Sequence, residues 1–167
     1  FRSNGKTDVY GFVVEDLLSA LSERFGGEWY VLVSSHPNMR SYYKKIYDFS
    51  HPRMIDVGDE DLQQILVASD VALTDYSSAG FEFALTYKPV FLICRDSEDY
   101  DRGFYINPED LPFPYAETDE ELIINILNFD NDKYLNDLEK FNKEVIGLKE
   151  TGHASEAVVE WMISKMH

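Results

Sequence analysis

The fold is decided by residues 71–94, VALTDYSSAGFEFALTYKPVFLIC. An apolar run at 71–75 is followed by a segment with helical spacing at 77–87 and by a second apolar run at 88–94. A strand, a helix and a strand joined by such short connections predict a βαβ unit, whose two strands are parallel. The polar residues that begin with Thr74 then lie where the first strand ends, and ligands bind at this edge of a parallel sheet.

A similar alternation of strands and helices extends over the rest of the chain. Continuous apolar runs predict further strands at 28–35 and 53–57. The polar stretch at 95–117 is expected to be a loop, and loops of such length are more often functional than accidental. Apolar stripes predict helices at 11–27, 59–70, 118–129, 130–148 and 153–166. We therefore expect an α/β fold: one Rossmann-like domain over residues 1–167, with a parallel sheet and helices on both faces.

Composition and charge exclude several classes of protein. The formal charge of −16 opposes binding to nucleic acid or to anionic lipid, because both require basic patches. No apolar run approaches the roughly 20 residues of a membrane-spanning helix, so we expect no direct membrane insertion by this chain. The single cysteine, Cys94, lies in an apolar run, which favours a buried, inert thiol and agrees with a reducing, cytoplasmic compartment. Because the chain begins at Phe1 rather than at methionine, we expect it to be part of a longer protein.

Two regions near the expected strands offer candidate residues for chemistry. His36 follows the first expected strand, where it could bind a phosphate or donate a proton to a leaving group. A histidine satisfied by backbone groups is an equally good interpretation, and placement alone leaves the choice open. His51 lies in a polar loop, where a structural role is favoured. Arg102 and Gly103, in the long loop, could clamp a phosphate, although an arginine among acids is usually a solvated ion pair.

The residues inside the βαβ unit are the strongest candidates. Ser77 and Ser78 bring two hydroxyls to the start of the helix, where backbone N–H groups also favour an anion. Serines there also cap helices, so chemistry alone leaves capping and phosphate binding open. Asp75 would repel a phosphate and is expected to cap the helix or to accept from a sugar hydroxyl. Gly80 is small enough to let a ligand approach, and Glu82, about one turn further, could accept from ribose hydroxyls.

Several motifs together resemble one known family. They are HP at 36–37, LTDYSSAGFEFAL with KPVFL within 73–92, DY with RGFY within 99–105, and GHASEAVVEWM at 152–162. In this order and spacing they resemble the carboxy-terminal half of the CDP-glycerol glycerophosphotransferase family, the teichoic acid polymerases and primases. The resemblance runs from about residue 28 to the end. It implies the GT-B architecture, with two Rossmann-like domains, of which this chain is the nucleotide-donor-binding domain.

The resemblance also implies roles for the candidate residues. His36 matches one of two histidines that are essential in the family. Ser77 and Ser78 match hydroxyl residues near the phosphates of the donor, and Asp75 belongs to the same motif. Arg102 matches the arginine of an Arg-Gly pair in the loop after the fourth strand. The second essential histidine, in a His-Gly-x-Pro type motif of the other domain, has no match here, so the chain alone is expected to be inactive.

The implied reaction moves glycerol phosphate from CDP-glycerol to a hydroxyl of a lipid-linked polyol-phosphate acceptor and releases CMP, in bacterial cell-wall teichoic acid synthesis. The acceptor would be bound through the missing domain, and the full-length protein would be cytoplasmic and peripheral on the cytoplasmic face of the membrane. No cofactor and no metal are expected, because no acidic metal-binding motif is evident. Phe113 stands where the family often has glycine, and Thr151 where it often has aspartate, which leaves loop geometry and the exact donor open.

Two alternatives remain at this point. A related transferase could use CDP-ribitol or a nucleotide sugar in the synthesis of capsule or another cell-surface polysaccharide. A non-catalytic acidic α/β module, such as a flavodoxin-like receiver domain, could act through protein contacts. That module would need an acidic pocket after its first strand, whereas this chain has Ser34, Ser35 and His36 there.

Overall fold

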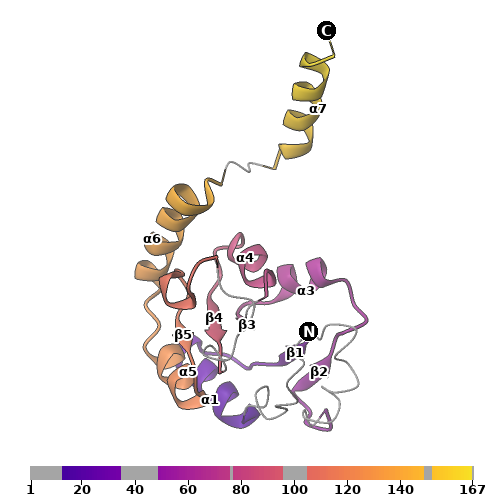
Figure 1. Cartoon of the computed structure of the whole chain (residues 1–167). Coiled ribbons are helices and arrows are strands. Elements are labelled where there is room, and N and C mark those ends of the chain that lie inside the picture. The colour runs from indigo at the N-terminus through magenta and orange to yellow at the C-terminus, as the bar shows by residue number, and fades with distance from the viewer. Residues whose placement is uncertain (1–12, 35–48, 76, 96–104, 149–151, 167) are drawn as a thin grey trace.

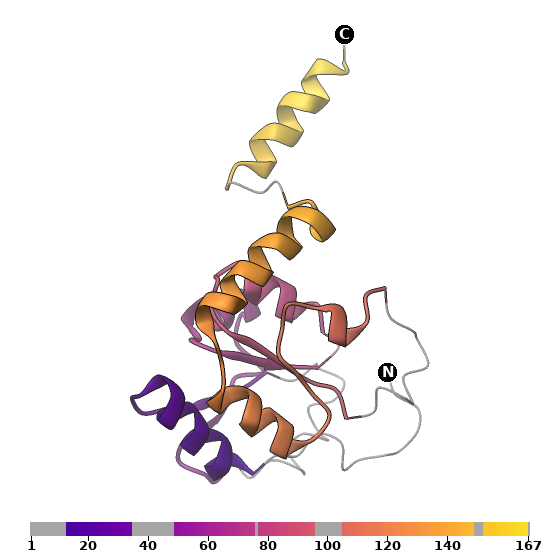
Figure 2. The ribbon, with the colours of Figure 1, turned by 90° about the vertical axis from the view of Figure 1, so that its left-hand side faces the viewer.

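The chain forms three layers around parallel strands. The computed structural model describes residues 13–34, 49–75, 77–95, 105–148 and 152–166. Helices α1 (Val14–Phe25) and α5 (Asp119–Leu127) lie side by side on one face of the strands. Helices α3 (Leu62–Ala68) and α4 (Ala79–Ala84) cover the other face (Figure 1). The view turned by 90° shows the same layers, which confirms the expected α/β fold with helices on both faces (Figure 2).

The described strands form two hydrogen-bonded sheets. Strand β1 (Val31–Val33) pairs in parallel with β2 (Met54–Asp56). Strands β3 (Ala72–Thr74), β4 (Val90–Ile93) and β5 (Tyr115–Ala116) form the second sheet, in which β4 is central and both pairings are parallel. The expected βαβ unit is therefore present as β3, α4 and β4. Within the described residues, no ladder joins β1 or β2 to the second sheet.

Strand β5 corrects the expectation that residues 95–117 are a loop throughout. The described part of this stretch contains a short 3₁₀ helix, Pro108–Asp110, and then β5. The N–H of Leu92 donates to the carbonyl of Pro114 at 2.9 Å, and the N–H of Cys94 donates to Ala116 at 2.9 Å. A strand of two residues beside a proline has no periodicity of its own, so only its pairing with β4 defines it.

The core lies on both sides of β4. Its residues Val90, Phe91 and Leu92 are buried, as expected for a strand that is covered on both faces. Cys94 is also buried, which confirms the expected environment of this thiol. Apolar side chains from the helices of both layers complete the core, among them Leu17, Leu21, Phe83, Ala84, Leu122, Ile126 and Leu138.

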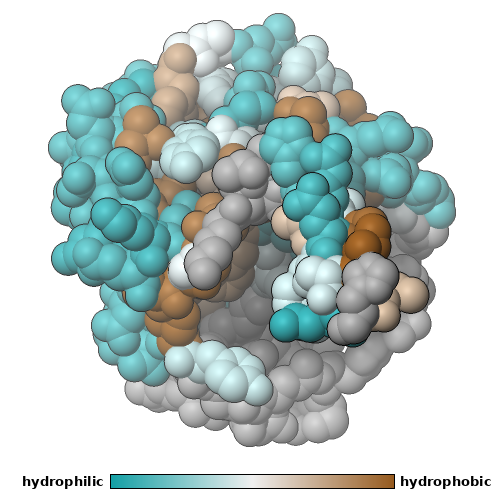
Figure 3. Space-filling view, turned by 90° about the horizontal axis from the view of Figure 1, so that it is seen from above, coloured by the Kyte–Doolittle hydropathy of each residue, from teal (hydrophilic) through white to brown (hydrophobic). Residues whose placement is uncertain are grey.

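Two helices follow α5. Helix α6 (Asn131–Phe141) continues into a π-helical turn, Asn142–Ile146. Helix α7 (Ala154–Ser164) points away from the layers, and its described side chains are exposed (Figures 1 and 2). Seen from above, hydrophilic residues dominate the α6 side, with apolar residues exposed between them (Figure 3). None of the helices in the described part of the chain combines the length and the apolar character needed to cross a bilayer.

Candidate functional site

The sequence-predicted site residues fall into two groups. Asp75, Ser77, Ser78 and Glu82 are described by the structure, and all lie at or just after the carboxyl end of β3. His36, Arg102 and Gly103 lie outside the described residues, so their roles stay predictions. The site can therefore be built from the β3–α4 connection and from what surrounds it.

Ser78 occupies the N-cap position of α4 without capping it. Its backbone is helical, with φ −61° and ψ −17°, and its side chain makes no capping hydrogen bond. Ser77 Oγ accepts a long hydrogen bond of 3.3 Å from the N–H of Ala79. Both serines are exposed. Their hydroxyl hydrogens therefore remain available to an acceptor outside the protein.

Other helices of the described chain show what capping looks like in this protein. Asp61 accepts from the N–H of Gln64 at 3.1 Å, and Asp130 accepts from the N–H of Lys133 at 2.9 Å. At α5 the hydroxyl of Thr118 accepts from the N–H of Glu121 at 3.2 Å. In return, the Glu121 carboxylate accepts from the N–H of the residue before the cap, at 2.8 Å. Against these three helices, Ser78 stands out as an N-cap serine whose hydroxyl is not used.

Glu82 lies on the same side of α4 as Ser78. The two residues are four apart, and the N–H of Glu82 donates to the carbonyl of Ser78 at 3.2 Å. The exposed carboxylate of Glu82 accepts a 2.6 Å hydrogen bond from Nε2 of Gln63 in α3. Gln63 is not among the residues predicted from the sequence, because its only sequence signal is its place in the first turn of a helix that follows a strand.

Asp75 follows β3 directly and is half-buried. Its expected role in holding the turn stays a prediction. With only six residues, α4 has a small macrodipole. Hydroxyl donors, rather than the helix dipole, would therefore provide most of the attraction for a phosphate at this edge.

Gly80 corrects one expectation. Its small size was expected to let a ligand approach, but Gly80 is buried and faces the sheet. A Cβ atom at this position would lie 3.0 Å from Cγ2 of Thr74 and 3.7 Å from Cγ1 of Val90. Glycine is therefore needed here because α4 packs closely on β3 and β4.

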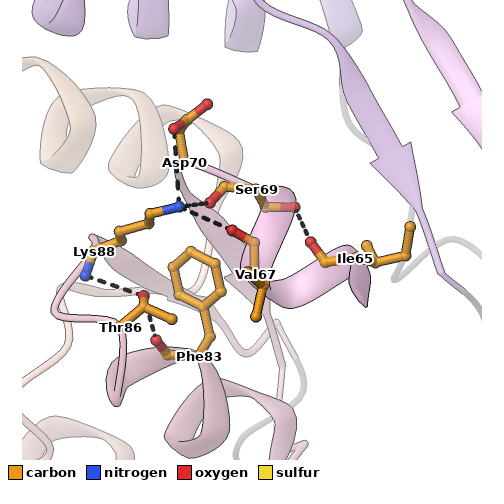
Figure 4. Close-up of polar contacts among 7 residues, drawn as sticks. All are labelled: Ile65, Val67, Ser69, Asp70, Phe83, Thr86 and Lys88. Carbon is orange, nitrogen blue, oxygen red and sulfur yellow. Dashed lines mark hydrogen bonds and ion pairs between the residues drawn. The ribbon is translucent and has the colours of Figure 1, made fainter. Parts of the chain in front are cut away.

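Lys88, which begins the Lys-Pro part of the motif, serves the structure. Its Nζ donates to the carbonyls of Val67 at 3.1 Å and Ser69 at 2.6 Å, and lies 4.0 Å from the Asp70 carboxylate (Figure 4). These carbonyls belong to the end of α3, where the backbone has no intrahelical partner. A cation at this end also complements the helix dipole.

The backbone of Lys88 is held as well. Its N–H donates to Oγ1 of Thr86 at 3.3 Å, and that hydroxyl donates to the carbonyl of Phe83 at 2.7 Å (Figure 4). Its carbonyl accepts from the hydroxyl of Tyr134 in α6 at 2.9 Å. Lys88 thus joins α3, α4, β4 and α6.

His51 and Arg95 also make contacts that serve the fold. His51 Nε2 lies 2.7 Å from Glu15 Oε1, and its Nδ1 accepts from the N–H of Arg53 at 3.2 Å, which supports a structural role for this histidine. The hydrogen bond from His51, with a contribution from Arg53, holds the pKa of Glu15 below its ordinary value. Arg95, directly after β4, forms an ion pair with Asp119 at the start of α5. In the described ranges, no group of three or more His, Cys, Asp or Glu side chains could hold a metal ion.

Phe113 explains one departure from the resemblance. It is buried, and its ring meets that of Phe81 in α4 edge to face, with centroids 5.7 Å apart. The residue that replaces a family glycine therefore anchors the described end of the long stretch on the helix that carries Ser78 and Glu82.

Residues 1–164 match the family model described as CDP-Glycerol:Poly(glycerophosphate) glycerophosphotransferase. The teichoic acid poly(ribitol-phosphate) polymerase of Bacillus spizizenii is 34% identical over 134 residues, which cover 74% of this chain and 20% of the polymerase. The teichoic acid ribitol-phosphate primase of the same organism is 29% identical over 98% of this chain and 42% of the primase. The teichoic acid poly(glycerol phosphate) polymerase of Bacillus spizizenii is 33% identical over 79% of this chain and 32% of the polymerase. The chain thus spans 20% to 42% of the length of these relatives.

Solved structures of the wall teichoic acid polymerase TagF share the fold. One variant superposes with a TM-score of 0.68 at 22% identity, over 99% of this chain and 41% of the polymerase. Another, described as soaked with CDPG, gives a TM-score of 0.67 at 25% identity, with the same coverage. The likeness confirms the expected fold class, a Rossmann-like domain of the GT-B type.

Proposed function

Because the chain belongs to the CDP-glycerol:poly(glycerophosphate) glycerophosphotransferase family, we propose that it is the donor-binding part of an enzyme of teichoic acid synthesis. The enzyme transfers glycerol phosphate from CDP-glycerol to a hydroxyl of a lipid-linked acceptor. The acceptor oxygen bonds to the phosphorus that bears glycerol, and the bond from that phosphorus to CMP breaks. CMP leaves with the electron pair, and the hydroxyl proton passes to a base in the other domain.

The two serines carry the proposal within the described residues. The single observation that supports it most is the exposed hydroxyl of Ser78, which sits at a helix start and takes no part in capping. A phosphoryl transfer needs donors that stabilise the charge of the phosphates and of the leaving CMP. Ser77 and Ser78 are such donors, and Asp75 holds the turn that presents them. His36, Arg102 and Gly103 would act on the same phosphates, as the sequence predicts.

The proposal places this chain within a larger enzyme. Residues 1–167 form the domain that binds the donor, and the remainder of the enzyme binds the lipid-linked acceptor. By itself the chain is inactive, because the second histidine of the resemblance has no match in it. The full-length protein works in the cytoplasm, at the cytoplasmic face of the membrane where a lipid-linked acceptor is available.

CDP-ribitol is the second candidate donor. It is favoured by the likeness to a poly(ribitol-phosphate) polymerase at 34% identity and to a ribitol-phosphate primase at 29% identity. The two donors share the cytidine and both phosphates, so the residues described above serve either one. The difference lies in the polyol.

Calorimetric titration of the 167-residue chain tests the proposal. We expect heat on addition of CDP-glycerol or CDP-ribitol and none with UDP-glucose. In the double variant Ser77→Ala/Ser78→Ala, affinity for the CDP donor falls by about tenfold or more, because hydrogen bonds to a charged group are lost. The Ser78 side chain makes no capping bond, and the double variant loses only the long hydrogen bond from the N–H of Ala79 to Ser77 Oγ, so the free energy of unfolding falls by no more than about 1 kcal/mol.

The control is Ser19→Ala, an exposed serine of α1 on the opposite layer, which leaves affinity unchanged. Binding of UDP-glucose with no heat from either CDP compound would overturn the donor assignment. Unchanged affinity of the double variant would remove the serines from the site.

A further inference from the structure

Gln63 and Glu82 form a contact between two helices at the side of the site. Nε2 of Gln63 in α3 donates to Oε2 of Glu82 in α4 at 2.6 Å. Both side chains are exposed, so the contact is not explained by burial of a polar group. An exposed pair of this kind adds little to stability, because water competes for both partners. The pair therefore lies at the surface, where a ligand can reach it.

The position of the pair fits the outline of a nucleotide. Ser78 and Glu82 are four residues apart on the same side of α4, which is a rise of about 6 Å. Helical side chains lean toward the amino end, so the Glu82 carboxylate leans toward Ser78. In a nucleoside 5′-phosphate, the 2′- and 3′-hydroxyls are separated from the phosphate by the width of the sugar, which is comparable to one helical turn. A phosphate at the serines brings the ribose to Glu82.

The hydrogen bond between the two side chains leaves one oxygen of each side chain able to accept a hydrogen bond from a ligand. A glutamine offers one carbonyl oxygen and two N–H groups, and a carboxylate offers two oxygens. With Nε2 on Oε2, the remaining oxygens are Gln63 Oε1 and Glu82 Oε1, and no hydrogen bond within the described residues occupies either. The ribose diol has two adjacent O–H donors. Two neighbouring acceptors therefore complement it.

We propose that Gln63 joins Glu82, the ribose contact already expected from the sequence, in binding the ribose cis-diol of the nucleotide, and that Gln63 makes the site select ribonucleotides over 2′-deoxyribonucleotides. The inference rests on the proposed function, since it requires a nucleotide phosphate at Ser77 and Ser78. Gln63 acts in two ways: it orients the Glu82 carboxylate through Nε2, and it accepts from one hydroxyl through Oε1. A 2′-deoxyribose leaves one of the two acceptors without a donor.

The test compares CMP with 2′-deoxy-CMP by calorimetry on the 167-residue chain. The wild-type chain is expected to bind CMP about tenfold more tightly, the equivalent of one hydrogen bond to a charged or strongly polar acceptor. In Gln63→Met, which keeps the length of the side chain without its polar atoms, the ratio of the two affinities falls to about threefold or less. A change in fold alone would weaken both nucleotides and leave the ratio unchanged.

The neighbouring Gln64 provides the control. It is exposed in the same turn of α3, and only its backbone N–H takes part in capping. Gln64→Met therefore keeps the tenfold ratio. Circular dichroism verifies the fold of each variant, and Gln63→Ala repeats the test if Gln63→Met does not fold.

The outcomes separate the two proposals. If the ratio of the affinities for CMP and 2′-deoxy-CMP is the same in wild type, Gln63→Met and Gln64→Met, Gln63 does not help to bind the ribose. The proposed function then remains intact. Equal affinity of the wild-type chain for CMP and 2′-deoxy-CMP would also overturn the proposed binding of ribose by Gln63 and Glu82 and leave the proposed function intact. If the wild-type chain binds neither CMP nor CDP-glycerol nor CDP-ribitol, the proposed function is wrong. The proposed binding of ribose by Gln63 and Glu82 is then wrong as well.

Discussion

The two ends of α4 belong to one sequence motif but differ in how they are bonded. At its start, Ser77 and Ser78 are exposed, and the Ser78 hydroxyl makes no capping bond. Beyond its end, Lys88 uses its ammonium, its N–H and its carbonyl in hydrogen bonds to the end of α3, to the turn after α4 and to α6. The start is left open toward solvent, and the end is satisfied within the protein.

The difference shows that a motif that marks a family need not be functional throughout. Gly80 and Lys88 are needed to pack α4 on the sheet and to fix the end of α3, respectively. The Ser78 side chain makes no capping bond, and the one bond that Ser77 accepts, from the N–H of Ala79, could be accepted equally well by another N-cap residue. Substitutions at the buried or bonded end should therefore change stability, and substitutions at the open start should change binding.

The largest effect on stability is expected from Gly80→Val. The new side chain would have to enter space already taken by Thr74, 3.0 Å from the ideal Cβ position. Overpacking of this kind costs about 1–3 kcal/mol, and we expect the upper part of that range because the clash involves a strand and a helix. Urea unfolding of the variant measures the change. The control Ala68→Val, at an exposed helical position, should lose less than about 1 kcal/mol.

A loss of stability in Gly80→Val would agree with the view that Gly80 serves the packing of α4. An unchanged midpoint in urea for Gly80→Val would break it, because the glycine would then not be required by packing. A glycine at this position would then have to be explained by the ligand instead.

An intermediate effect is expected from Lys88→Met. The variant keeps the aliphatic part of the side chain but loses the bonds to the Val67 and Ser69 carbonyls. We expect the free energy of unfolding to fall by about 1–2 kcal/mol, because carbonyls at the end of a helix lose a charged donor. Affinity for CDP-glycerol should remain within about twofold of wild type.

The matched control is Lys133→Met, since Lys133 forms an exposed ion pair with Asp137 one turn along α6. Pairs of this type contribute about 0.3–0.5 kcal/mol. If Lys88→Met weakened nucleotide binding strongly and left stability as it was, Lys88 would belong to the open start rather than to the bonded end.

Much of this organisation could be predicted from the sequence, and what was missed has a common cause. The β3–α4–β4 unit follows from apolar runs and helical spacing, and burial of Cys94 follows from its apolar neighbours. Strand β5 could not be predicted, because two residues beside a proline become a strand only through pairing with β4. The role of Gly80 was misjudged because its neighbour Thr74 reaches it only once α4 folds over β3.

The site was predicted in part for the same reason. Ser77 and Ser78 are adjacent in the sequence and follow a predicted strand, so the sequence alone predicts that they lie together at the end of that strand. Gln63 is 19 residues from Glu82 and meets it only because α3 and α4 are neighbours in one layer. Contacts between elements depend on the three-dimensional arrangement, and no local pattern encodes them.

The smallest effect is expected from Tyr134→Phe, which removes only the hydroxyl that donates to the Lys88 carbonyl. At pH 7 we expect a loss of about 1 kcal/mol in the free energy of unfolding. Burial raises the pKa of the Tyr134 phenol well above its ordinary value. The phenol therefore ionises first in the unfolded chain, and the stability it contributes, complete below a pH of about 10, is lost as the pH rises beyond it. Urea unfolding at pH 8 to 11 should show the gap between wild type and Tyr134→Phe closing, since the other tyrosines titrate alike in both proteins. A gap that stays constant would mean that this phenol is ionised as easily in the folded chain, and that the bonded end of the motif is less closed than its hydrogen bonds indicate.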